Sequence, residues 1–158
     1  MMKEKAPKYF TAYDRLEDVK LLVKEYADSL GIDLSFQSFH KEISDLKGKY
    51  GPPRGSMHLC YVGNEAVGII ALTDFDGKRG EMKRLYIKPQ YRGKGIARKL
   101  SETIIEDAKK IGYEGILLDS LQDMKAAQAL YYSLGFEEIS PYYENPIPGT
   151  VYMYKKLK

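Results

Sequence analysis

The sequence predicts an α+β protein, an α/β sandwich in which helices cover a mixed sheet of about seven strands. Helical hydrophobic spacing alternates along the chain with strand-like segments, three of which are consecutive and joined by glycine-containing turns. The predicted order of elements is βααβββαβαββ. No repeat or linker divides the 158 residues, so we expect one domain over residues 1–158, with residues 1–6 as a loose tail.

The first third of the chain predicts one strand and two helices. The segment "KYFTAYD" has strand character, and the apolar residues that follow it recur at helical spacing as far as Leu30. Gly31 favours a left-handed helix end. A second helix is expected to end at Gly48, and its apolar positions are Phe36, Phe39, Ile43 and Leu46.

The rest of the chain is predicted to form three strands and a helix, followed by a strand, a second helix and two final strands. "MHLCYV", "AVGIIALTDF" and "GEMKRLYIK" are separated by turns that favour antiparallel hairpins. The segment from Ile96 to Gly112 is an amphipathic helix. "GILLDS", a helix from Met124 to Leu134, and strands near Phe136 and at "TVYMYKKL" complete the order. Because a helix connects them, "GEMKRLYIK" and "GILLDS" are expected to run parallel.

Composition and charge narrow the classes of protein. Hydrophobic residues make up 44% of the chain and the net charge is +3, so we expect a globular protein without general affinity for nucleic acid or membranes. A single cysteine, Cys60, excludes an internal disulfide. His40 and His58 are far apart and have no metal-ligand spacing, so no metal is expected. We expect a cytoplasmic protein, since no apolar run is long enough to span a bilayer.

The segment "YIKPQYRGKGIARKL" passes from a strand through a basic glycine turn into a helix. The first amides of a helix and the positive end of its dipole favour an anion at this point. Gly93 and Gly95 permit close approach of a phosphate group. The basic side chains around them are Arg92, Lys94, Arg98 and Lys99. On local grounds alone, a connection with solvated basic side chains explains the pattern equally well.

Other phosphate-binding motifs do not fit these residues. The chain has no GxxxxGK[ST], and "GKGIAR" departs from GxGxxG because Arg98 replaces the third glycine. The loop instead resembles the acyl-CoA loop of the GNAT N-acetyltransferase superfamily, [RQ]xxGx[GA]. Arg92, Gly95 and Ala97 fill its three fixed positions.

The resemblance extends over nearly the whole chain. The order of elements is similar to that of the superfamily, and "LYIKPQYRGKGIA" resembles its strand ending, proline and loop. "AAQALYYSLGF" resembles its second signature. The sequence departs from the pattern at Met124, where members often carry an asparagine that contacts the pantetheine arm of the cofactor.

The resemblance implies that acetyl-CoA binds in a wedge where the fourth and fifth strands splay apart. The main chain of the fourth strand would pair with the pantetheine amides, and the glycine loop would hold the pyrophosphate. The side chains of Leu85 and Ile87 are expected in the core, because only their backbone is implied. The cofactor-binding residues are then Leu85, Tyr86, Ile87, Arg92, Gly93, Lys94, Gly95, Ile96 and Ala97.

Two catalytic residues follow from the resemblance. Glu81 occupies a position similar to that of the general base, and strand alternation predicts Glu81, Lys83, Leu85 and Ile87 on one face. A solvated glutamate paired with Lys83 or Arg79 is an equal alternative. Tyr131 occupies the position of the general acid for the departing thiolate, whereas its helical spacing alone favours a core residue. A main-chain amide of the fourth strand, that of Tyr86 or Ile87, would meet the charge on the carbonyl oxygen.

The expected function is transfer of acetyl from acetyl-CoA to a primary amine by direct attack in a ternary complex. The acceptor stays open among small amines, polyamines, peptide N-termini and lysine side chains. Tyr142, Tyr143 and Glu144 in the "PYYENPIPG" loop are candidates to bind it, although a merely rigid loop explains this segment slightly better. The alternatives are a non-catalytic acyl-CoA-binding module and an RNA-binding domain. The resemblance also implies a homodimer.

Overall fold

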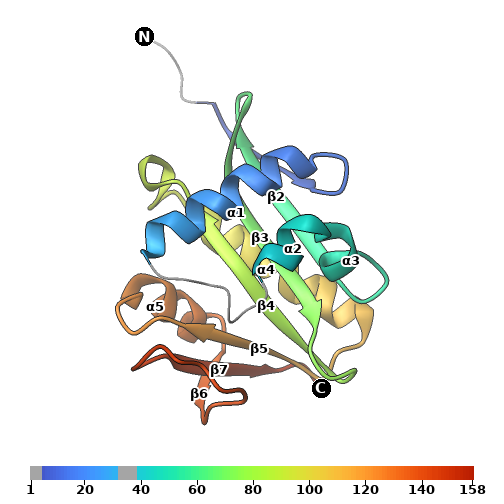
Figure 1. Ribbon diagram of the computed structural model, residues 1–158, viewed down its shortest axis with the longest axis vertical. Coiled ribbons are helices and arrows are strands. Elements are labelled where there is room, and N and C mark those ends of the chain that lie inside the picture. The colour runs from blue at the N-terminus through green and yellow to red at the C-terminus, as the bar shows by residue number, and fades with distance from the viewer. Residues whose placement is uncertain (1–4, 32–38) are drawn as a thin grey trace.

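A computed structural model describes residues 5–31 and 39–158 of the chain. Its strands form one sheet in the order β1-β2-β3-β4-β5-β7-β6 (Figure 1). The strands are β1 (Pro7–Thr11), β2 (Ser56–Val62), β3 (Glu65–Asp74), β4 (Arg79–Ile87), β5 (Gly115–Ser120), β6 (Glu137–Ile139) and β7 (Val151–Lys156). The helices are α1 (Leu16–Leu30), α2 (Phe39–Ser44), α3 (Leu46–Tyr50), α4 (Ile96–Ile111) and α5 (Lys125–Ser133), with a 3₁₀ turn, η2 (Pro89–Tyr91), before α4.

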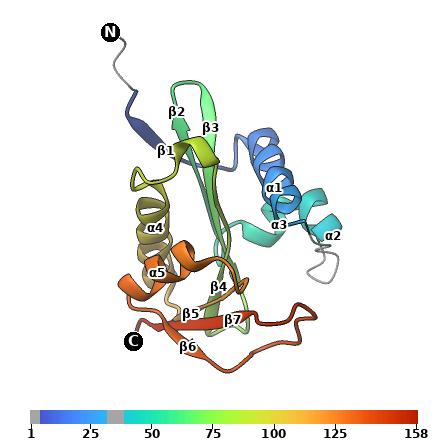
Figure 2. The same cartoon turned by 90° about the vertical axis from the view of Figure 1, so that its left-hand side faces the viewer.

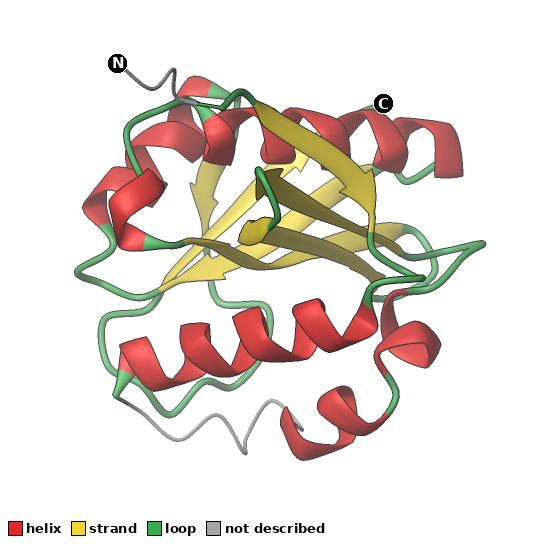
Figure 3. Cartoon of the chain, turned by 90° about the horizontal axis from the view of Figure 1, so that it is seen from above, coloured by secondary structure: helices red, strands yellow, loops and turns green. Residues whose placement is uncertain are grey.

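Helices cover both faces of the sheet. Figure 2 shows α1, α2 and α3 on one side and α4 and α5 on the other, and Figure 3 shows the strands between these layers. A buried cluster on the α1 side includes Val19, Leu59 and Ile69. A second cluster on the α4 side includes Ile70, Leu100 and Ile104. The predicted α+β sandwich with seven strands is therefore confirmed.

The second predicted helix is wrong in its details. The chain forms two short helices there, because Asp45 interrupts the helical run and caps α3 by accepting a hydrogen bond from the Gly48 amide at 2.9 Å. Helix α3 continues through Gly48, and Gly51 follows its last residue. Phe36 and residues 1–4 of the expected tail lie outside the described residues.

Strands β4 and β5 run parallel, as predicted, and then separate. Their pairing joins Arg79 to Gly115 and ends where Glu81 lies opposite Leu117. Strand β4 continues to Ile87 and β5 to Ser120, and Figure 1 shows the two strands diverging. This confirms the predicted splay and leaves one edge of β4 without a neighbouring strand.

A β-bulge in β4 overturns the predicted alternation. Ile69 pairs with Tyr86 and Ala71 pairs with Lys83, so β4 carries one more residue than β3 across this interval. Arg84, in this interval, has a φ of 64°. The extra residue moves Leu85 and Ile87 to the α4 side with Met82, where they pack in the second cluster. Glu81 and Lys83 face the opposite, α1 side.

Candidate active site

The loop between η2 and α4 depends on two glycines. Gly93 and Gly95 have φ values of 78° and 84°, a left-handed conformation that side chains with a Cβ adopt only with strain. An added Cβ at either position would find no atom within 4 Å. The glycines therefore set the path of the backbone and leave open space beside it.

The amides at the start of α4 lack acceptors. In helix α4 the amide of Lys99 makes the first backbone bond, to the Gly95 carbonyl at 3.1 Å, and no side chain caps the helix. Among the described residues, no acceptor pairs with the amides of Gly93, Gly95, Ile96, Ala97 and Arg98. Consecutive donors at the positive end of a 16-residue helix form a site for an anion.

Arg92 fastens this loop to the end of β4. Its Nε donates to the Ile87 carbonyl oxygen at 2.9 Å, and its guanidinium lies 5.7 Å from the Tyr86 ring centre. Arg98 donates to the Ser133 hydroxyl at 2.6 Å, which joins the start of α4 to the end of α5. The two arginine side chains thus fix the loop that carries these amides to β4 and to α5.

A cavity of about 60 Å³ occupies the gap between β4 and β5. Tyr26 of α1 and Tyr131 of α5 both line it, so the gap connects the two faces of the sheet. The lining residues are Tyr26, Met82, Lys83, Arg84, Leu85, Leu118, Asp119, Ser120, Met124, Ala127 and Tyr131. Met124, at the position of the usual asparagine, therefore contributes an apolar wall.

Tyr131 is buried, with 8% of its surface exposed. Burial raises the pKa of its phenol, and the nearby hydroxyl of Tyr26 and carboxylate of Asp119 raise it further. Tyr131 lines the cavity, and no hydrogen-bond partner is described for its hydroxyl within residues 5–31 and 39–158. It is therefore a protonated donor beside the gap.

Glu81 is buried at the point where the strands part, but it does not line the cavity. Its Oε2 accepts from the Tyr142 hydroxyl at 2.7 Å, and its Oε1 lies 3.7 Å from Lys83 Nζ. Arg79 pairs instead with Asp76, at 2.8 Å. Lys83 itself lines the cavity, and burial lowers the pKa of its ammonium.

The tyrosines of the last loop hold carboxylates in place. Tyr142 packs edge-on against Phe75 at 5.1 Å between ring centres while it donates to Glu81. The Tyr143 hydroxyl donates to Oδ2 of Asp119. Neither tyrosine lines the cavity, and Glu144 is exposed with no interaction described in this part of the chain.

A buried ion pair at the bulge was not predicted from the sequence. Arg84 Nε donates to Glu42 Oε2 at 2.8 Å, and Lys49 Nζ lies 3.0 Å from Glu42 Oε1. Burial alone would raise the pKa of Glu42, but the hydrogen bonds and charges of Arg84 and Lys49 lower it to about 2. The sequence feature that could have indicated the bulge is the pair of adjacent charged residues, Lys83 and Arg84, which breaks the alternation of "GEMKRLYIK".

Asp119 was missed as well. It is the carboxylate that lines the cavity, and its Oδ2 also lies 3.3 Å from Asn145 Nδ2. A charged residue within the apolar strand "GILLDS" was the signal that could have identified it.

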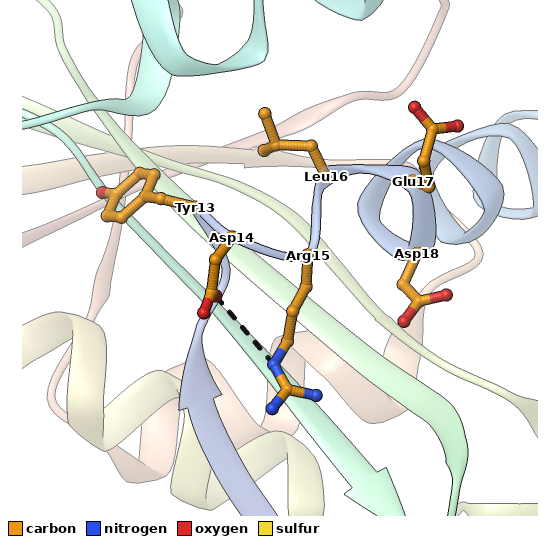
Figure 4. Close-up of a pocket in the computed structure, with 6 residues that line it drawn as sticks. All are labelled: Tyr13, Asp14, Arg15, Leu16, Glu17 and Asp18. Atoms are coloured by element: carbon orange, nitrogen blue, oxygen red, sulfur yellow. Dashed lines mark ion pairs between the residues drawn. The ribbon is translucent and has the colours of Figure 1, made fainter.

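A larger hollow of about 420 Å³ lies elsewhere, at the connection between β1 and α1. Six consecutive residues, Tyr13 to Asp18, line it, and Figure 4 shows their side chains pointing in different directions. The ion pair drawn there joins Asp14 and Arg15 at 4.0 Å. Polar groups do not converge on this hollow, so it is a weaker candidate for a site than the gap between β4 and β5.

Clusters of metal-binding side chains and membrane-spanning helices are both absent from residues 5–31 and 39–158. No group of three or more histidine, cysteine, aspartate or glutamate side chains is arranged to hold a metal ion in this part of the chain. Among the same residues, no helix has the length and apolar character needed to cross a membrane.

The amide-lined loop beside two diverging strands of a mixed sheet matches the arrangement that the resemblance to the GNAT acetyltransferases implies. Residues 20–136 match the family model described as the acetyltransferase (GNAT) family. The chain belongs to the GNAT family of acetyltransferases.

Relatives and solved structures agree with this assignment. An uncharacterized N-acetyltransferase of Schizosaccharomyces pombe is 42% identical over 140 residues, covering 87% of this chain and 86% of that protein. A GNAT acetyltransferase of Staphylococcus aureus has the same fold, with a TM-score of 0.81, 21% identity and coverage of 97% and 100%. An acetyltransferase of Salmonella typhimurium, solved with its cofactor acetyl-CoA, has a TM-score of 0.69, 18% identity and coverage of 98% and 95%.

The buried ion pair at the bulge gives a test of stability. In Glu42→Gln, the Arg84 guanidinium keeps its buried position but loses its main counter-charge, so we expect the free energy of unfolding at pH 7 to fall by about 3–5 kcal/mol. Because folding lowers the pKa of Glu42, the wild-type protein loses this contribution as pH falls from about 4.5 towards about 2. The difference between the two proteins should therefore shrink on acidification.

Urea unfolding at pH 7, 4 and 3 measures this difference. Glu17→Gln is the matched control, because Glu17 forms an exposed ion pair with Lys20 at 3.4 Å. We expect less than about 0.5 kcal/mol from the control. If both substitutions lowered the free energy of unfolding at pH 7 by the same small amount, the expected contribution of the Arg84–Glu42 pair to stability would be contradicted.

Proposed function

We propose that the protein is an acetyl-CoA-dependent N-acetyltransferase that transfers acetyl to a primary amine by direct attack in a ternary complex. The observation that carries this proposal is the set of amides without acceptors among the described residues, those of Gly93, Gly95, Ile96, Ala97 and Arg98, beside the unpaired edge of β4. The Salmonella structure with acetyl-CoA, which has the same fold, supports the choice of cofactor.

The residues present fit acetyl-CoA in two places. Amides in the segment Arg92 to Ala97 would hold the diphosphate, which needs several converging donors and no side chain in the way. The backbone of Leu85, Tyr86 and Ile87 would pair with the extended pantetheine amides as an added strand. The thioester would then reach the cavity between β4 and β5.

The proton chemistry is assigned to two side chains. A lysine-like amine with a pKa of about 10.4 needs about 4–5 kcal/mol to lose its proton at pH 7, so a base is required. We assign this role to Glu81, acting through water because Glu81 does not line the cavity. The neutral amine nitrogen bonds to the carbonyl carbon, with the main-chain amide of Tyr86 or Ile87 polarising the oxygen.

Collapse of this adduct breaks the carbon–sulfur bond. The sulfur takes a proton from the Tyr131 hydroxyl, and the amide nitrogen gives up its second proton, which restores the phenol through water. The raised pKa of Tyr131 keeps the phenol protonated until the thiolate departs. The products are an N-acetylated amine and free CoA.

Two glycine substitutions test the diphosphate site. Gly95→Ala and Gly77→Ala place a Cβ in open space at nearly equal φ, 84° and 83°, so both should be destabilised by a similar amount, about 1–2 kcal/mol. Only Gly95→Ala should weaken CoA binding, by about tenfold or more, because its Cβ occupies space beside the amides. Calorimetric titration with CoA measures the binding. Equal CoA affinity of both variants would contradict the site.

Substitutions of the two assigned catalytic residues test the chemistry. We expect Tyr131→Phe and Glu81→Gln each to lower kcat by about 10²–10⁴-fold, with CoA binding retained, in a thiol-release assay with a panel of primary amines. Tyr132→Phe is the control, because Tyr132 is 51% exposed on the same helix. If the wild-type protein binds acetyl-CoA but acetylates no amine, the non-catalytic acyl-CoA-binding alternative is favoured.

A further inference from the structure

We propose that the acceptor is a small zwitterion, an amino acid whose amine contacts Asp119 and whose carboxylate faces Lys83. This inference rests on the proposed function and adds the chemical class of the acceptor. Two side chains of opposite charge, Lys83 and Asp119, line the gap between β4 and β5.

Asp119 lines the cavity, and its carboxylate is held in place through one oxygen. Both hydrogen bonds described for its carboxylate, from the Tyr143 hydroxyl and from Asn145 Nδ2, end on Oδ2. Asn145 Nδ2 also lies 2.9 Å from the Tyr143 hydroxyl, so the loop holds the carboxylate from two sides. Oδ1 has no partner among the described residues and can accept a hydrogen bond from an amine in the cavity.

Lys83 supplies the opposite charge. Its side chain is 9% exposed, lines the cavity, and lies 3.7 Å from Glu81. The neighbouring Arg84 is held much closer to its own partner, Glu42, at 2.8 Å. A nearly buried ammonium whose ion pair with Glu81 is as long as 3.7 Å gains more from a bound carboxylate than an exposed ammonium does.

The strand register places these two groups across the gap from one another. Glu81 lies opposite Leu117 in the last pair, so Lys83 and Asp119 are the next residues on the same face, at the point where the strands part. The charge of Asp119 acts on Lys83, which agrees with their facing positions. A simple alkylammonium ion would be attracted by the Asp119 carboxylate and repelled by the Lys83 ammonium. An amino acid zwitterion can place its ammonium at Asp119 and its carboxylate at Lys83.

The rest of the cavity limits the acceptor's size. Met82, Leu118 and Ala127 form apolar walls, and the volume is about 60 Å³. A compact amino acid suits this enclosure better than a long polyamine, which would need further anionic groups along its length.

Matched pairs of amines test the proposal. Glycine is compared with methylamine and alanine with ethylamine, each as acceptor with acetyl-CoA, for the wild-type protein and the variants Lys83→Met, Lys83→Arg and Asp119→Asn. We expect wild-type kcat/KM to favour the amino acid of each pair by about tenfold or more. Lys83→Met should abolish this preference through the KM of the amino acid, and Lys83→Arg should keep it. Asp119→Asn should raise the KM of both members.

Lys109→Met is the control variant. Lys109→Met removes an exposed lysine that pairs with Glu106 at 3.2 Å, and it should change neither member of a pair. No preference in the wild-type protein, an equal fall in kcat for both members in Lys83→Met, or no acetylation of any of these amines would overturn the proposal. A thermal-shift measurement with acetyl-CoA distinguishes failure of this proposal from failure of the proposed function. If acetyl-CoA does not raise the melting temperature, the proposed function itself is contradicted.

Discussion

The separation of β4 from β5 after Glu81 and Leu117 is the constraint on which the rest of the site depends. A sheet that stayed paired would have satisfied its own backbone groups and closed the cavity. Because the strands part, β4 keeps an open edge, Tyr26 and Tyr131 meet the same space from opposite faces, and the chain leaving β4 turns into the amide-lined loop. One local divergence thus links the candidate cofactor site to the candidate acceptor site.

Interactions on both sides hold the gap open. On the β4 side, the bulge at Arg84 is fixed by the buried pair with Glu42, and Arg92 fastens the loop to Ile87. On the β5 side, the last loop of the chain holds Asp119 through Tyr143 and Asn145. Buried charged side chains, among them Glu42, Glu81 and Arg84, therefore lie around the gap.

The fold and the candidate cofactor loop were predictable because they depend on local patterns. Helical periodicity, glycine turns and the strand-to-helix connection at Gly93 and Gly95 specify elements that the structure contains. The bulge was not predictable by counting alternate residues, since an extra residue shifts every later side chain to the other face. This is why Leu85 and Ile87 lie opposite Glu81 and Lys83.

The acceptor site depends on contacts between distant segments, which a single sequence does not reveal. Tyr142 and Tyr143 were candidates to bind the acceptor, beside the slightly favoured alternative of a rigid loop. Their hydroxyls bind Glu81 and Asp119, and the cavity is lined by residues of other elements. Asp119 and Lys83 become neighbours only through the parallel register of β4 and β5. The roles proposed for Glu81, Tyr131 and Asp119 therefore rest on the gap that joins them.

The central claim is that main-chain amides at the start of α4 hold a diphosphate. Amide hydrogen exchange followed by NMR, with and without CoA, measures this for each residue. The account predicts that CoA slows exchange at Gly95, Ile96 and Ala97, and that pantetheine, which lacks the diphosphate, does not. Binding of CoA that leaves these amides unchanged would contradict the account.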